Sequence, residues 1–275
     1  MKFVYAQAPL QEAEFVLIGV PDESGNKSPR AGSKRGPDAI RKVAYERCVF
    51  KRKGTFSFAQ ASPVSIKQKI HDYGNVEKKK LSKVIEVLKG KIPIVLGGDH
   101  SITAEVLKQF PEVTVIYFDA HEDIISSLHD YYGSVLTDTK INLGKCLQIG
   151  VREKAIEELK HIKKESLGLI SAETCHEKGM EFVWGEIQNK VIGPVYLSID
   201  LDVFDPSLAP AVAHPSPGGL NYYDVLFLLK KILKEYDVVG FDIMELTPSY
   251  DHDQRTAHLA TKLLLEMIEN YKEKK

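Results

Sequence analysis

Short apolar runs alternate with amphipathic segments along most of the chain. Runs of about four to eight residues rich in valine, isoleucine and phenylalanine are typical of strands buried on both faces of a parallel sheet. Segments with apolar residues three and four positions apart are typical of helices that cover such a sheet. The predicted strands span residues 14–20, 70–73, 92–98, 113–120, 146–151, 168–172, 195–202 and 238–245. The predicted helices span residues 38–47, 76–88, 101–110, 153–165, 178–188, 222–236 and 256–271.

This alternation predicts an α/β fold with a mostly parallel sheet and helices on both of its faces. Residues 21–36 are polar and rich in glycine, proline and serine, which indicates a loop. Residues 50–65 have no clear period and receive no assignment. Because no repeat or linker divides the chain, we expect a single domain over residues 1–275.

Composition and charge narrow the class of protein. The 275 residues are 43% hydrophobic and 27% charged, which is typical of a globular domain large enough to bury a core. The net charge of −1 gives the chain no bulk attraction for nucleic acids or anionic membranes. No apolar run approaches membrane-spanning length, and Glu12 and Glu14 lie where a signal peptide needs its apolar core. Cys48, Cys146 and Cys175 have no paired spacing, so we expect free thiols in a reducing cytoplasm.

The apolar run at 113–120 leads into three groups that bind metals, Asp119, His121 and Asp123. Extended backbone points residues i, i+2 and i+4 to one side, so we expect these groups to converge where the strand stops. Two carboxylates and an imidazole suit a divalent ion such as Mn²⁺, Fe²⁺ or Zn²⁺. Solvated charges at a strand end are the alternative for this one motif.

Two other predicted strands end in similar groups. His100 follows the strand at 92–98, and Asp200 and Asp202 share a face of the strand at 195–202. Ligands bind beyond the carboxyl ends of parallel strands, and a cation would offset the high free energy of burying unpaired carboxylates. A lone histidine is more often a structural hydrogen bonder, but beside these acids His100 becomes a plausible ligand. The predicted metal ligands are therefore His100, Asp119, His121, Asp123, Asp200 and Asp202.

Six such groups are too many for one structural zinc ion and fit two ions that share carboxylates. Ligation rich in carboxylates favours Mn²⁺. Two Mn²⁺ ions would bridge a water molecule, lower its pKa and hold it as a hydroxide nucleophile for hydrolysis. Asp123, beside both metal and water, would relay the proton.

Six segments occur in the order and spacing of the ureohydrolase family, which the chain resembles over nearly its whole length. They are GPDAIR (36–41), GGDHS (97–101), DAHED (119–123), SIDLDVFDP (198–206), PSPGGL (215–220) and FDIMELTPSYD (241–251). The family comprises arginase, agmatinase, formimidoylglutamase and guanidino-acid hydrolases. The resemblance implies a three-layer α/β/α catalytic domain, two Mn²⁺ ions per subunit, and a homo-oligomer, usually a trimer or hexamer.

The resemblance also implies roles for individual residues. The six residues above match the family's metal ligands one for one, and Glu245 matches the carboxylate that holds the guanidinium of the substrate. A strand-end carboxylate suits a planar cation of this kind. The alternative is a structural Glu245, for instance one paired with Arg255.

Three departures from the family pattern bear on proton transfer and substrate. The family loop after DAHED supplies a histidine, following a glycine, that carries a proton to the leaving amine. Here Gly133 is followed by SVLTD, which puts Leu136 or Asp138 at that position. His129 in the same loop is either a substitute or a surface residue.

The second departure is His214, which replaces a family threonine near Glu245. It could contact the substrate, carry the missing proton, or narrow the pocket by packing. The third departure follows Arg152, where arginases have aspartates that bind the α-amino group of arginine and this chain reads EKAIEE (153–158). That difference argues against arginase and for a smaller or differently terminated amidine.

We therefore predict a Mn²⁺-dependent hydrolase of C–N bonds in linear amidines, with Asp123 and His214 as catalytic residues. Agmatine, cleaved to putrescine and urea, is the leading substrate. Formimidoylglutamate and guanidino acids are the alternatives. The altered loop also allows a metal-loaded but catalytically silent binding subunit, although retention of all six ligands argues against it.

Overall fold

The sheet at the centre of the molecule has eight strands, all parallel. The computed structural model describes residues 1–52, 55–58, 66–154 and 167–272. The strand order is β4-β1-β5-β10-β9-β6-β7-β8, and every neighbouring pair is parallel. The strands are β1 (Phe15–Gly19), β4 (Ile70–Asn75), β5 (Ile92–Leu96), β6 (Thr114–Phe118), β7 (Cys146–Val151), β8 (Gly168–Ser171), β9 (Val195–Asp200) and β10 (Val238–Met244). This confirms the predicted α/β fold with a parallel sheet.

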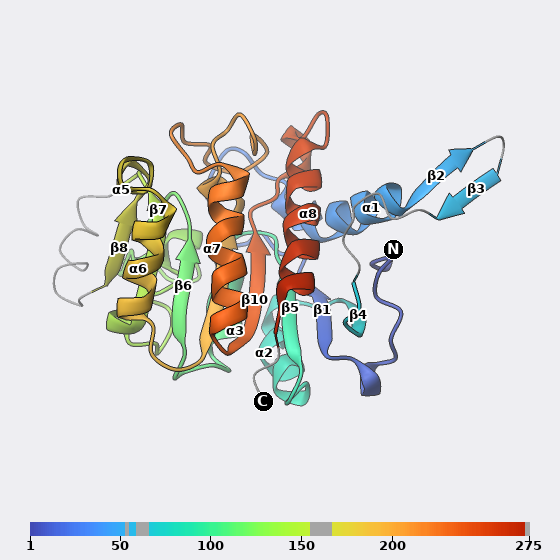
Figure 1. Ribbon diagram of the computed structural model, residues 1–275, viewed down its shortest axis with the longest axis horizontal. Helices are drawn as coiled ribbons and strands as arrows, with labels where there is room; N and C mark the ends of the chain where they lie inside the picture. Colours follow the sequence, from blue (N-terminus) through green and yellow to red (C-terminus); the bar gives the residue numbers. More distant parts are fainter. Residues whose placement is uncertain (53–54, 59–65, 155–166, 273–275) are drawn as a thin grey trace.

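Helices cover both faces of the sheet, and side chains on alternate strand positions enter two separate cores. Phe15 and Leu17 of β1 pack into one core, whereas Val16 and Ile18 pack into the other. Helices α6, α7 and α8 lie side by side over the first face (Figure 1). That face carries α1 (Gly36–Cys48), α5 (Ala172–Lys178), α6 (Met180–Lys190), α7 (Tyr222–Glu235) and α8 (Arg255–Asn270), and the second carries α2 (Lys78–Val87) and α3 (Ile102–Leu107).

The central strands are apolar along their whole length because both of their faces are covered. Every residue of β1, β6, β7 and β9 is buried. This pattern is typical of a parallel sheet between two helical layers. Across the described part of the chain, no helix combines the length and the apolarity that a bilayer crossing requires.

A hairpin occupies part of the segment that had no predicted element. Strands β2 (Val49–Arg52) and β3 (Thr55–Phe58) pair antiparallel as a separate two-stranded sheet. The hairpin extends from the end of α1, away from the central sheet (Figure 1).

One predicted strand differs from the structure in a way that matters for the site. The strand predicted to reach Asp202 ends at Asp200, and Leu201–Val203 form a 3₁₀ turn. The turn forms because the Asp200 side chain accepts a hydrogen bond from the backbone amide of Asp202, at 2.7 Å. The prediction that Asp200 and Asp202 share a face of one strand is therefore wrong.

The helix predicted at 178–188 corresponds to α6, and the helix α5 that precedes it was not predicted. The two helices are separated by Gly179, whose φ of 76° ends the first helix. Of the helix predicted at 153–165, residues 155–165 lie outside the described residues.

The strand order places the ends of sequence-distant strands next to one another. β5, β10, β9 and β6 are neighbours in the centre of the sheet, where the order of connections reverses. Ligands bind α/β sheets at such a reversal, beyond the carboxyl ends of the strands.

Candidate metal centre

The predicted metal-binding groups lie together at the carboxyl ends of three of these central strands. His100 follows β5, Asp119 follows β6, and Asp200 is the last residue of β9. His121, Asp123 and Asp202 come within a few residues of the same ends. All six side chains except that of His121 are buried.

Two glycines let the chain bring His100 into the centre. A Cβ atom on Gly97 would collide with the sulfur of Met244, and one on Gly98 would collide with the carbonyl oxygen of Asp22. Only a residue without a side chain allows this close approach.

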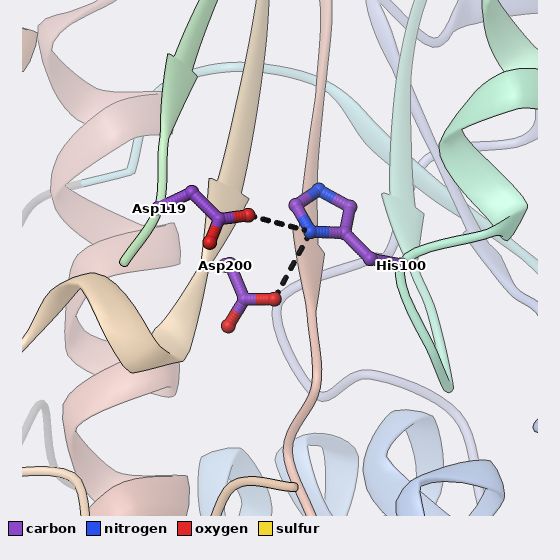
Figure 2. A group of neighbouring side chains, drawn as sticks. All are labelled: His100, Asp119 and Asp200. Atoms are coloured by element: carbon purple, nitrogen blue, oxygen red, sulfur yellow. Dashed lines mark hydrogen bonds and ion pairs between the residues drawn. The ribbon is translucent and has the colours of Figure 1, made fainter. Parts of the chain in front are cut away.

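The first group consists of His100, Asp119 and Asp200 (Figure 2). Nδ1 of His100 lies 3.0 Å from Oδ2 of Asp200 and 3.1 Å from Oδ2 of Asp119. The ligand atoms of the group all lie within 4.8 Å of one another. This spacing would allow one cation to contact all three side chains.

The second group consists of Asp119, His121 and Asp202. Nδ1 of His121 lies 3.0 Å from Oδ2 of Asp202 and 3.4 Å from Oδ1 of Asp119. The other oxygen of Asp202 accepts a hydrogen bond from the amide of Ala120, at 3.0 Å, which orients the carboxylate. Asp119 thus belongs to both groups and stands between them.

The residues of the two groups fit divalent cations. Burial opposes ionisation of Asp119, yet the neighbouring imidazoles of His100 and His121 hold its pKa below the usual range. Burial and the neighbouring carboxylates Asp202 and Asp119 raise the pKa of Asp200 well above its usual value. Oδ2 of Asp119 is buried and accepts no hydrogen bond from the described residues. A cation would supply the missing partner and relieve the crowding of negative charge.

Asp123 lies beside the first group, but its backbone is not extended, contrary to the prediction from sequence. Its φ is 51°, in the left-handed region, so the chain turns sharply after His121. Oδ2 of Asp123 lies 3.5 Å from Nδ1 of His100 and accepts a hydrogen bond from the Tyr117 hydroxyl, at 2.7 Å. Burial and the charge of Asp119 raise the pKa of Asp123 well above its usual value. This turn, and not an extended backbone, brings the carboxylate of Asp123 to the first group.

Glu245 follows β10 with a strained backbone, at φ 68°. Oε1 accepts a hydrogen bond from the backbone amide of His100, at 2.9 Å. Oε2 is buried and has no hydrogen bond from the residues that the structure describes. Burial and the charge of Asp99 raise the pKa of Glu245 well above its usual value. Arg255, the partner considered from sequence, donates to Asp253 instead.

A cleft of about 690 Å³ opens over this centre. His121 and Asp123 line it together with His214 and Tyr132. A second hollow of about 740 Å³ lies beside α2 and α3, where Lys78 and His129 are among its lining residues. Because the second hollow is lined by none of the six predicted ligands, the first is the one that gives access to the metal groups.

His214 faces the centre and is hydrogen-bonded to Tyr132, which was not among the residues predicted from sequence. Its Nε2 lies 2.7 Å from the Tyr132 hydroxyl, and its ring lies edge-on to that of His121, with centroids 5.9 Å apart. Burial, and then the charge of His121, lower the pKa of His214. Burial and Tyr131 raise the pKa of Tyr132, so its phenol stays protonated. The only sequence signal for Tyr132 was its place in the loop after DAHED.

The loop residues considered as replacements for the family histidine lie elsewhere. Leu136 is buried in the second core. Asp138 accepts hydrogen bonds from the Ser134 hydroxyl and from the amide of Asp130. His129 pairs with Asp138 at 2.7 Å, and 80% of its side chain is exposed. Ile125, Tyr131, Tyr132 and Gly133 of this loop line the cleft, and Tyr132 is the one whose hydroxyl is hydrogen-bonded to His214.

The rim of the cleft carries the start of the EKAIEE segment. Glu153 and Lys154 line it, and Glu153 accepts a hydrogen bond from the Ser216 hydroxyl at 2.8 Å. Residues 155–158 lie outside the described part of the chain. Arg152 turns inward and donates to the carbonyl oxygens of Asp202 and Ser216, which holds the two loops together.

Comparisons with known proteins agree with this fold and show the family. The sequence profile of the arginase family matches residues 13–269. An uncharacterized 32.2 kDa protein of Methanothermus fervidus is 32% identical and aligns over 98% of each chain. The agmatinase of Neisseria meningitidis serogroup A is 31% identical, over 93% of this chain and 86% of its own. The crystal structure of agmatine ureohydrolase of Thermoplasma volcanium superposes with a TM-score of 0.85 at 30% identity, over 98% of this chain and 93% of that one.

Proposed function

The chain belongs to the arginase family of hydrolases, and we propose that it uses two Mn²⁺ ions to hydrolyse a C–N bond of a linear amidine or guanidine, with agmatine as the first candidate. The observation that carries the proposal is the pair of ligand groups that share Asp119. A carboxylate common to two groups suits a pair of ions that share a ligand, and the excess of carboxylates over imidazoles favours Mn²⁺.

The chain would hold the ions through His100, Asp119 and Asp200 on one side and through Asp119, His121 and Asp202 on the other. We place Asp123 with the first group because it lies 3.5 Å from Nδ1 of His100. When bound, such ions polarise the amidine and lower the pKa of an attacking water molecule. The remaining roles belong to the protein.

Glu245 is proposed to bind the amidinium. Its Oε2 is buried and makes no hydrogen bond to the described residues, so an N–H group of the substrate can be its partner. The hydrogen bond from the His100 amide to Oε1 fixes the orientation of the carboxylate. A charge-assisted hydrogen bond in this buried position would be strong.

Two residues are proposed to move protons. Asp123 takes the first proton, since the hydroxyl of Tyr117 holds its carboxylate beside the centre. His214 then carries a proton to the leaving amine, because a neutral imidazole can accept and release one within the cleft. The Tyr132 hydroxyl, 2.7 Å from Nε2, would hold the imidazole in place.

Agmatine is the first candidate because two of the similar proteins are an agmatinase and an agmatine ureohydrolase. A guanidino acid is the second candidate, since Lys154 at the rim of the cleft could pair with a carboxylate. Formimidoylglutamate also carries carboxylates and remains an alternative for the same reason.

We further propose a homo-oligomer, a trimer or hexamer, in the cytoplasm. An isolated two-stranded sheet is marginally stable in water, so the projecting β2–β3 hairpin favours a partner subunit. Cys146 and Cys175 are buried free thiols, which suits a reducing compartment.

The test is a panel of agmatine, arginine, guanidino acids and formimidoylglutamate with Mn²⁺-loaded protein. Urea, formamide and ammonia are followed together. Release of urea from agmatine supports agmatine as the substrate. Release of formamide from formimidoylglutamate would make formimidoylglutamate the substrate instead. Two bound ions with no turnover of any amidine would favour the silent binding subunit instead.

A further inference from the structure

The two ring nitrogens of His100 face opposite surroundings. Nδ1 points to the carboxylates of Asp119 and Asp200 (Figure 2). Nε2 points the other way and lies 2.8 Å from the hydroxyl oxygen of Ser198. The side chains of His100, Asp119, Asp200 and Ser198 are all buried, so water does not compete for these positions.

Behind Ser198 lies a carboxylate on which three hydroxyl groups converge. Asp242 of β10 is completely buried. Its Oδ2 accepts from Thr103 at 2.9 Å and from Tyr196 at 2.8 Å, and its Oδ1 accepts from Ser198 at 2.8 Å. All three hydroxyl groups donate to Asp242, which accepts at both of its oxygens.

The hydroxyl of Ser198 has one proton, and that proton is used in the bond to Asp242. Toward His100, Ser198 can therefore only accept a hydrogen bond. Nε2 of His100 must then carry a proton. A neutral imidazole has one N–H group, so a proton on Nε2 leaves the electron pair of Nδ1 free.

From this geometry we propose that Ser198 and Asp242 are positioning residues that direct Nδ1 of His100 to a metal ion. The inference rests on the proposed function, because it needs a cation in the first group. Ser198 would act on the metal only through the proton of Nε2. Tyr117 supports the same arrangement, since its ring stacks on His100 with centroids 4.5 Å apart and planes 5° apart.

This arrangement predicts an effect on one of two ions. His100 belongs to the first group, whereas His121 belongs to the second. Loss of the Ser198 hydroxyl would leave the Nε2 proton buried without an acceptor whenever Nδ1 binds a metal. The first ion should therefore bind more weakly, and the second should change much less.

The experiment is calorimetric titration of Mn²⁺ into metal-stripped protein, with bound metal counted by mass spectrometry. Ser198→Ala is compared with wild type and with Tyr196→Phe. The control also removes a hydroxyl that bonds Asp242, but it leaves the link from Ser198 to His100 intact. Thermal unfolding of each stripped protein shows that the variants fold.

We expect wild type to bind two ions and Ser198→Ala to bind one of them roughly 10- to 100-fold more weakly. The other dissociation constant, and both constants of Tyr196→Phe, should stay within about twofold of wild type. If Ser198→Ala does not fold, Asp242→Asn replaces it with the same expectation, since the amide keeps the volume but lacks the negative charge.

If Ser198→Ala and wild type bind both Mn²⁺ ions with equal affinity, the positioning role of Ser198 is wrong, whereas the proposed metal centre is unaffected. An equal loss in Tyr196→Phe would also overturn the positioning role, because the effect would then come from general disturbance of the core. A wild-type protein that binds no Mn²⁺ would remove the proposed function and this inference together.

Discussion

The hydroxyl of Tyr132 lies 2.7 Å from Nε2 of His214, on one wall of the cleft that leads to His121 and Asp123. The two residues come from segments far apart in the sequence. Arg30 holds the second segment by donating to the carbonyl oxygens of Pro210 and Val212, at 2.8 and 2.9 Å. The amide of Tyr132 is hydrogen-bonded to Gly25 in the same loop as Arg30. Residues 21–36 thus fix the two halves of the pair relative to each other.

Replacing His214 should slow turnover without removing metal. As the proposed proton carrier, His214→Ala should lower kcat by about 10²- to 10⁴-fold, the usual contribution of a general acid or base. Tyr132→Phe removes one hydrogen bond and should lower kcat only about 2- to 10-fold. Steady-state release of urea measures both. His129→Ala is the matched control, since this exposed histidine pairs with Asp138 away from the cleft.

A His214→Ala enzyme that matches the wild-type kcat would remove the proton-carrier role. If KM alone rises, His214 contacts the substrate instead. His214→Thr, which restores the residue common in the family, separates packing from proton transfer because it cannot carry a proton at neutral pH.

The pH profile should change in the same variant. Burial and the charge of His121 lower the pKa of His214 below its ordinary value of 6.5. The imidazole is therefore neutral at pH 7 and becomes protonated only on the acid side of 6.5. We expect kcat to fall in that range because a protonated His214 cannot accept a proton. In His214→Ala, kcat should depend less on pH in this acidic range. If the decrease in kcat at acidic pH is unchanged in the variant, another group causes it.

Removal of Asp119 should affect both metal ions, because this residue belongs to both ligand groups. Asp119→Asn should retain few or no Mn²⁺ ions after gel filtration, whereas Asp202→Asn should retain one. Asp205→Asn is the control, because Asp205 accepts hydrogen bonds from Ser207 and Gly218 in a turn outside both groups. Metal content per chain gives the answer. Equal loss in the Asp119 and Asp202 variants would contradict a shared carboxylate.

Glu245 should matter for the substrate and not for the metal. Glu245→Gln removes the negative charge, and hydrogen bonds to charged groups contribute about 1.5–3 kcal/mol. We therefore expect kcat/KM for agmatine to fall about 10- to 100-fold, with the Mn²⁺ content unchanged. Loss of metal together with activity would instead give Glu245 a structural role in holding the backbone of His100.

A buried ion pair in the N-terminal part of the sheet should control stability. Arg41 and Asp72 are 99% buried and make two hydrogen bonds of 2.9 Å. Arg41→Ala should lower the free energy of unfolding by about 3–5 kcal/mol, since it leaves a buried carboxylate unpaired. Lys34→Ala breaks a surface pair with Glu23 in which the lysine is 58% exposed, and it should change the free energy of unfolding by at most about 1 kcal/mol. Urea unfolding measures both.

The same pair predicts how stability depends on pH. Burial opposes ionisation of Asp72, but hydrogen bonds from Arg41 and the Phe3 amide outweigh it and hold the pKa below its ordinary value of 3.8. A depressed pKa adds stability above pH 3.8 that is lost as the pH falls through the folded-state pKa. Asp72→Asn should therefore be less stable than wild type at pH 7, and the gap should narrow below about pH 4. If the difference in stability between wild type and Asp72→Asn stays constant with pH, the ionisation of Asp72 is not the cause of the pH dependence.

The sequence by itself determined the sheet and the identity of the residues at its carboxyl edge. Runs such as Thr114–Phe118 and Val195–Asp200 are apolar throughout, and only strands covered on both faces require this. Chemical groups that directly follow buried strands must lie at one edge of a parallel sheet. His100, Asp119, Asp200 and Glu245 could therefore be assigned to one site before any distance was known.

The tertiary structure alone decided how the loops beyond that edge are shaped. Asp123 turns at φ 51°, Asp202 lies on a 3₁₀ turn, and Tyr132, not a residue after Gly133, reaches His214. Local sequence did not reveal these features because loop conformation depends on hydrogen bonds with distant segments, such as those of Arg30 and Arg152. The pairing of Ser198 with His100 depends likewise on β9 and β5 both lying beside β10, a consequence of strand order that no single motif contains.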